Sequence, residues 1–173
     1  MIKNPLISVP LKFGLIGSGL FMAMFLVTYF IEKNPLIDLK LFDFILIPIF
    51  LFTAMKQYRD YANDNILHFW QGMTIGFITF IVIGLLSGFF VFIMLALIDP
   101  GILASYIAYT SDLFEAKREE FIQQFGEQLY NDSFETNLKT SAIKMGIDDF
   151  LKKAGIGFLL TIPIAVILRR REF

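Results

Sequence analysis

The sequence has no cysteine among its 173 residues and a single histidine, His68. The lack of cysteine excludes disulfides, thiol catalysis and thiolate metal sites, and one histidine leaves little material for a histidine-based metal site. The phosphate-binding Walker loop and the G-x-S-x-G, H-E-x-x-H and G-x-G-x-x-G motifs are also absent. We therefore expect a protein that is not an enzyme, with no catalytic residue, no cofactor and no metal.

Charge is scarce as well, and it is missing altogether from residues 69–98. Hydrophobic residues make up 56% of the chain and the mean hydropathy is +0.65, whereas ordinary soluble domains are about 45–50% apolar. The net charge of −1 argues against a nucleic-acid partner, which would need a basic face. The composition predicts an integral membrane protein in contact with membrane lipids.

The apolar stretches predict an all-α fold with four transmembrane helices in a single membrane domain. A helix over the uncharged run would be about 45 Å long, more than the ~30 Å hydrocarbon core of a bilayer, so it must tilt or project from the lipid. No small-residue cleavage site follows the first stretch, which indicates a retained helix rather than a signal peptide. The predicted spans are residues 11–31, 36–55, 69–98 and 151–168.

The sizeable polar region of the chain, about residues 99–150, lies between the third and fourth predicted spans. Apolar residues recur in it at spacings of seven, four and four, which is a helical stripe: Phe114, Phe121, Phe125 and Leu129. We predict an amphipathic helical hairpin outside the bilayer. Its two helices are expected at roughly 112–130 and 134–151.

Basic residues beside the spans set the predicted orientation. Lysine and arginine accumulate in cytoplasmic segments, and the triplet Arg169, Arg170 and Arg171 follows the last span. With four spans, the N-terminus lies on the same side as this triplet. We therefore expect both termini in the cytoplasm and the polar region on the extracytoplasmic side.

The third span carries four glycines, Gly72, Gly76, Gly84 and Gly88, at spacings of four, eight and four. Glycine lets helix backbones approach closely in a bilayer, so we predict that this glycine stripe is a helix-packing interface. The interface is either a seam between proteins or internal to the chain. From first to last the stripe winds by about 160° at ~100° per residue, so its two pairs can serve different neighbours.

The segment at residues 67–77 (LHFWQGMTIGF) resembles domain-of-unknown-function family 4199. Further similar segments are 41–45 (LFDFI), 59–61 (RDY), 98–100 (IDP) and 167–170 (ILRR). The resemblance covers essentially the whole chain. It implies a small four-span protein of the bacterial inner membrane, and it implies no activity, because none is assigned to the family.

Three polar residues near the spans are candidate functional groups. Asp43 lies just inside the second span, where an ionisable group is a functional hypothesis; the alternative is a hydrated position at the outer interface. His68 is either a proton relay, a role that histidine often has in proteins, or a headgroup-level residue bonded to the link before it. Gln71, in the first turn of the third span, can hydrogen-bond another helix for about 1 kcal/mol.

Asp148 and Asp149 precede the last span as an acidic pair. One interpretation is a cation site, although calcium needs oxygen ligands beyond two carboxylates and no loop spacing here supplies them. The other interpretation is helix capping, or i,i+4 pairing with Lys152 and Lys153.

The glycine stripe and the lack of a catalytic constellation predict an accessory or scaffold subunit. It would pack against itself as a homo-oligomer or against a larger inner-membrane complex. The alternative is a small transporter or channel component, acting as an oligomer, with a polar path through Asp43, His68, Gln71 and Thr161. A membrane enzyme acting on lipid is a third alternative, and it would need ionisable groups converging at one interface.

Overall fold

The computed structural model describes residues 4–38 and 42–170, and within these ranges the chain is helical apart from loops and an isolated β-bridge. The all-α class is confirmed. In chain order the elements are α1 (Pro5–Phe30), α2 (Pro35–Asp38), α3 (Phe42–Ala62), α4 (Phe69–Ile93), the π-helix η1 (Met94–Ile98), α5 (Gly101–Ala116), α6 (Arg118–Phe125), α7 (Glu127–Leu138) and α8 (Ala142–Leu168).

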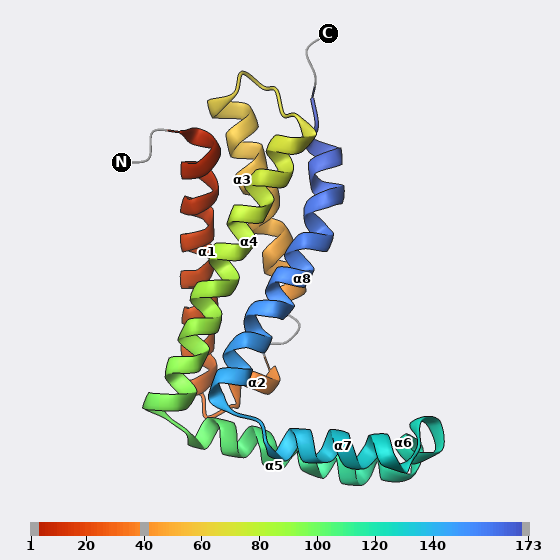
Figure 1. Cartoon of the computed structure of the whole chain (residues 1–173). Helices are drawn as coiled ribbons and strands as arrows, with labels where there is room; N and C mark the ends of the chain where they lie inside the picture. Colours follow the sequence, from red (N-terminus) through yellow and green to blue (C-terminus); the bar gives the residue numbers. More distant parts are fainter. Residues whose placement is uncertain (1–3, 39–41, 171–173) are drawn as a thin grey trace.

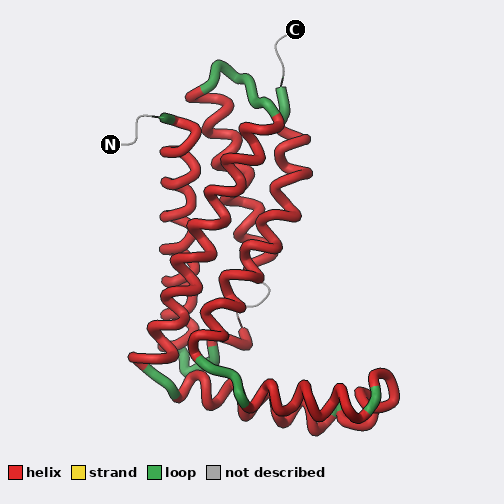
Figure 2. The backbone as a smooth tube through the Cα atoms, in the orientation of Figure 1, coloured by secondary structure: helices red, strands yellow, loops and turns green. Residues whose placement is uncertain are grey.

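The long helices α1, α3, α4 and α8 lie side by side as a bundle (Figure 1). α4 is the central helix, because it packs against α1, α3 and α8, while α3 also contacts α1 and α8. The start of α1 and the end of α8 lie at one end of the bundle, and α5, α6 and α7 extend sideways from the other (Figure 2). Buried aliphatic and aromatic side chains fill the space between the helices along its length.

The sequence predicted four spans, but three of the described helices are long and apolar enough to cross a membrane: Pro5–Phe30, Phe69–Ile98 and Ala142–Leu168. α3 falls short of this criterion because its last two turns carry Lys56, Arg59 and Asp60. Three helices therefore support the multi-pass membrane character. The fourth long helix of the bundle, α3, differs from them in its charged C-terminal end.

Two of the spans begin earlier than predicted, because polar caps lie outside the apolar runs. α1 starts six residues earlier, where the Asn4 side chain accepts a hydrogen bond from Leu6 N at 3.0 Å. α8 starts nine residues earlier, where Ser141 Oγ accepts from Lys144 N at 3.3 Å. Hydropathy locates the lipid-compatible part of a helix, whereas capping residues decide where the helix itself begins.

The glycine stripe on α4 packs against α8 along its whole length, and at Gly72 and Gly76 it also meets Met55 of α3. A Cβ added to any of the four glycines would collide with an α8 atom, and on Gly88 it would lie 2.5 Å from the Gly146 carbonyl oxygen. The interface with α8 is internal to the chain. Because α8 contacts both pairs of glycines and α3 contacts the first pair as well, the neighbours of the two pairs overlap. The four contacts pair Gly72 with Ala165, Gly76 with Thr161, Gly84 with Phe150, and Gly88 with Gly146.

The polar region forms an arm made of α5, α6 and α7, which projects roughly across the bundle axis (Figure 1). The predicted helix bounds, 112–130 and 134–151, are wrong. The first helix is interrupted at Lys117 and at Gly126, whose φ of +88° lies in the left-handed region that favours glycine. The second is divided between α7 and the start of α8. The helix ends in this region are therefore set by local breaks in the backbone and not by the spacing of the apolar residues.

Aromatic rings hold the arm together at its outer end. The ring centroids of Phe114 and Phe121 are 6.1 Å apart, and Tyr130 lies 5.9 Å from Phe121. Tyr130 is buried, and Arg118 lies over its ring at 5.7 Å. The predicted apolar stripe therefore forms a small core in part, since Phe125 remains 57% exposed.

We predict that Gly88→Ala destabilises the protein by about 1–3 kcal/mol, because the methyl group must displace the backbone of α8 rather than a flexible side chain. The measurement is the thermal unfolding midpoint in detergent. Gly19→Ala is the matched control, because a Cβ there meets nothing within 4 Å, and it should leave the midpoint unchanged or slightly raised. An equal midpoint for the two variants would contradict the close α4–α8 contact.

Candidate functional site

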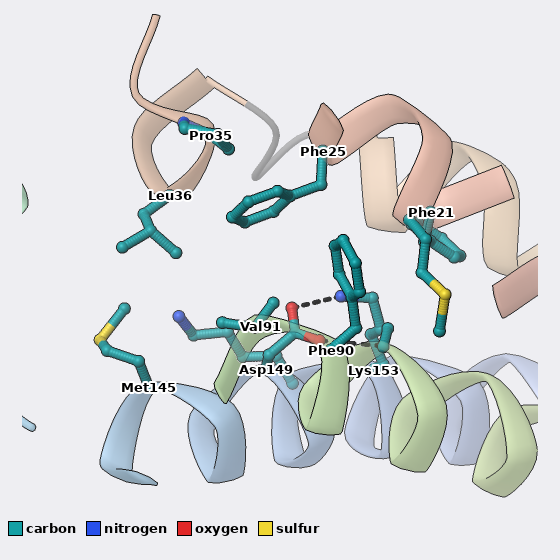
Figure 3. A pocket seen from close by; sticks show the side chains of 12 residues that line it. Phe21, Phe25, Pro35, Leu36, Phe90, Val91, Met145, Asp149 and Lys153 are labelled. Carbon is teal, nitrogen blue, oxygen red and sulfur yellow. Dashed lines mark hydrogen bonds and ion pairs between the residues drawn. The ribbon is translucent and has the colours of Figure 1, made fainter. Parts of the chain in front are cut away.

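A partly buried ion pair lies between the helices of the bundle. Lys153 is 4% exposed, and its ammonium pairs with the carboxylate of Asp149 one turn earlier on α8. Ser87 of α4 donates a hydrogen bond from Oγ to the other carboxylate oxygen at 2.9 Å. Figure 3 shows both interactions as dashed lines. The three groups form the polar cluster of the bundle core.

The glycine stripe is what brings these groups together. Ser87 lies beside Gly88 on α4, where that helix touches the backbone of α8. Because the helices are so close, the short serine side chain reaches the carboxylate of Asp149 across the interface. A third helix, α1, also contacts the cluster. The Lys153 ammonium lies 4.9 Å from the centroid of the Phe21 ring of α1, a cation–π arrangement.

A cavity of about 70 Å³ adjoins the polar cluster, and we call it the vestibule. Its walls come from α1, α2, α4 and α8, and α2 lies beside the arm end of the bundle in Figure 1. Most of the wall is apolar, and charge is concentrated on the α8 side. The lining residues are Phe21, Met22, Phe25, Pro35, Leu36, Ser87, Phe90, Val91, Met145, Asp149, Lys152 and Lys153.

The two candidate aspartates have different surroundings. Asp149 pairs with Lys153, so the i,i+4 interpretation is confirmed at this position. Asp148 lies near enough to the arm to act on Tyr106 of α5: burial raises the pKa of Tyr106, and the negative charge of Asp148 adds to that shift. Within residues 4–38 and 42–170, no group of three or more histidine and carboxylate side chains is placed to hold a metal. The predicted pair is thus divided between two interfaces.

Gln71 closes the opposite end of the bundle. Its Oε1 accepts hydrogen bonds from the backbone N of His68 at 2.9 Å and from Asn63 Nδ2 at 3.3 Å, and its Nε2 donates to Tyr58 Oη at 3.2 Å. The predicted hydrogen bond to another helix is confirmed, since Tyr58 belongs to α3. The side chain of His68 itself is exposed. Gln71 therefore fixes the α3–α4 loop.

The polar path predicted for a transporter includes Asp43, Gln71, His68 and Thr161, and the described members make hydrogen bonds at separate places in the bundle. Thr161 donates its hydroxyl to the Gly157 carbonyl at 2.6 Å and is wholly buried against Gly76. Gln71 makes its hydrogen bonds at the bundle end. Asp43 lies in the first turn of α3, and its side chain is outside the described residues. Two buried polar side chains, Ser87 and Lys153, instead meet at Asp149.

Sequence reasoning paired Lys153 with Asp149 but missed that Lys153 is buried, and it missed Ser87 as a member of this cluster. Lys153 lies close to the start of the predicted fourth span, where a lysine usually snorkels to the headgroups. The available signal was its i,i+4 spacing from Asp149, together with the small polar Ser87 between two glycines of the stripe. The sequence does not reveal how far inside the bundle these residues lie, because that position depends on α8 beginning well before its apolar run.

The apolar helices and their bundle define a multi-pass α-helical membrane protein. A family model described as protein of unknown function (DUF4199) matches residues 12–170. The chain therefore belongs to this family, as the sequence resemblance implied. No curated protein matches the chain. No solved structure matches it either.

We predict that Lys153→Met destabilises the protein by about 1–3 kcal/mol, because the Asp149 carboxylate, which is 20% exposed, keeps the Ser87 hydrogen bond but loses its counter-ion. The double variant Asp149→Asn/Lys153→Met removes both charges and should lose less than the single variant. Thermal unfolding in detergent measures both. Glu135→Gln, which breaks an exposed pair with Lys139 on the arm, is the control and should have little effect. Equal losses in the single and double variants would refute the charge argument.

Proposed function

We propose that this protein is a non-enzymatic, multi-pass protein of the bacterial inner membrane that acts as an accessory or scaffold subunit. The observation that carries the proposal is the arm, which extends beyond the footprint of its own bundle (Figure 1). An arm directed across the bundle axis lies along the membrane surface when the bundle spans the bilayer. It is therefore placed to reach a neighbouring protein, either a second copy or a larger complex.

The glycine stripe gives no support to this role, because α8 of the same chain occupies it. The surface of the arm supports it better. Residues 101–138 contain seven acidic and two basic residues, so the arm has a strong negative bias. Large apolar side chains are also exposed on it: Tyr109, Leu113, Phe125, Leu129 and Leu138. Apolar residues surrounded by carboxylates favour a protein surface with basic residues as the partner.

Four crossings and an extracytoplasmic arm are part of the same proposal. α3 is flanked by α1, α4 and α8, and the part of it before Lys56 exposes large apolar side chains outward, among them Phe44, Ile45 and Ile49. Such a surface is compatible with lipid, and the charged end of α3 then lies at headgroup level. The basic residues Arg169 and Arg170 favour a cytoplasmic location for that end.

The accessory role predicts that the arm contacts another protein in native membranes. A photo-crosslinking amino acid at Leu129 of α7 should yield adducts larger than one chain, because this side chain is 48% exposed on the arm. The same amino acid at Leu159 of α8, 68% exposed on the bundle, is the control and should yield fewer. Gel electrophoresis and mass spectrometry of the products identify a second copy or a different protein. A strictly monomeric particle with no arm adduct would contradict the proposal.

A small transporter or channel component is the second candidate, and the observation that favours it is the polar cluster at the vestibule. Ionisable groups inside a bundle typically mark ion or solute pathways. Under this candidate the double variant Asp149→Asn/Lys153→Met abolishes an ion or solute flux into proteoliposomes that the unchanged protein supports. Flux that persists unchanged in the double variant would remove the support for transport.

A further inference from the structure

The vestibule adjoins a charged group that lies well along α8 from the arm end of the bundle. Lys153 lies eleven residues after the start of α8, which is about 16 Å along the helix axis at 1.5 Å per residue. The described vestibule wall at the arm end comes from the single turn of α2, through Pro35 and Leu36, rather than from α3. Where the cavity lies, the described wall thus includes the short helix α2 and not the long helix α3.

The size and the lining of the vestibule favour water over lipid. A cavity of about 70 Å³ holds several waters, since each needs roughly 10–15 Å³ by this measure, whereas drug-sized ligands occupy roughly 300–1,000 Å³. The side chain of Asp149 remains 20% exposed. Ser87 and two lysines also line the space, so a water molecule has the polar partners that it requires.

The charges around the vestibule favour an anion. Its described lining residues include two lysines and one aspartate, and the aspartate pairs with Lys153. The exposed Lys152 therefore gives the described wall a positive bias. Apolar side chains such as Phe25 and Phe90 surround these charges, and low-dielectric walls strengthen and focus the field in a cleft.

We propose that the vestibule is a water-filled half-channel, open at the arm end, that admits small monovalent anions to the Asp149–Lys153 pair. The half-channel is independent of the accessory role, because it needs no second protein. It also requires no transport, since entry of an anion is distinct from its passage across the membrane. Its failure and the failure of the proposed function are therefore distinguishable.

The natural lack of cysteine allows a direct test with single cysteines and membrane-impermeant methanethiosulfonate reagents in native membrane vesicles. Met22→Cys places a thiol in the vestibule wall, and Ala23→Cys, one residue further along α1 and so at nearly the same depth, places it on the exposed face of that helix. Val91→Cys and Phe89→Cys form a second matched pair on α4, since Phe89 is 61% exposed outside the bundle. Asn131→Cys on the arm reports which side of the vesicle the reagent reaches.

We expect labelling of Met22→Cys and Val91→Cys at least tenfold faster than labelling of their partners Ala23→Cys and Phe89→Cys. Labelling should occur only when the reagent is added to the side on which Asn131→Cys reacts. After each rate is divided by the rate with a free thiol, the anionic sulfonatoethyl reagent should react faster than the cationic trimethylammonium reagent in the vestibule. Lys152→Gln, an exposed substitution, should reduce that preference several-fold.

Three results would overturn the inference. Equal labelling of the members of both pairs would show that the vestibule is no wetter than the lipid face. Labelling from the side opposite the arm would show that the opening is misplaced. A normalised preference for the cationic reagent, or none, would exclude an anion site. Full labelling of every variant after denaturation in dodecyl sulfate, with unchanged gel-filtration profiles beforehand, verifies that each thiol is present and that the chain is folded.

Discussion

The close backbone contact between α4 and α8 is the constraint on which the rest of the structure depends. Lipid offers helices no hydrophobic gain on association, so association in a bilayer relies on close contact at small residues. Here glycines on α4 let α8 approach along its full length, and at Gly88 the two backbones touch. That approach sets the position of Ser87 relative to Asp149. The polar cluster thus forms because the glycines of α4 have no side chains to hold α8 away.

The buried pair is tolerable because each charge has several partners. Taking a carboxylate and an ammonium out of water costs several kcal/mol each, and their attraction offsets this cost only when further hydrogen bonds are present. Asp149 has Lys153 and the Ser87 hydroxyl, and Lys153 has Asp149 and the Phe21 ring. A well-packed apolar pair of similar volume is often as stable as such an ion pair, so stability alone does not account for charge at this depth.

The helices and the glycine interface could be predicted from the sequence, since uncharged runs and four-residue spacing are local patterns. The partner of the interface could not, because any of several helices can fill the gap beside Gly76. The helix bounds within the arm were predicted wrongly for a local reason. The positive φ of Gly126 ends a helix that the apolar period alone would continue. The depth of Lys153 was missed because hydropathy places charged residues at the edge of a span, while the cap at Ser141 starts α8 well before it.

The two ends of the bundle differ in a way that joins the arm to the vestibule. At the end near the termini, Gln71 links α4 to α3, and Leu67 pairs with Arg170. At the other end, α2 lines the vestibule, and Asn34, just before α2, donates hydrogen bonds to the Ile102 carbonyl at 3.0 Å and to Ser105 Oγ at 2.9 Å on α5. The segment that walls the cavity is therefore tied to the base of the arm. Because Asn34 makes both hydrogen bonds to α5, a displacement of the base of the arm would strain the segment that lines the vestibule.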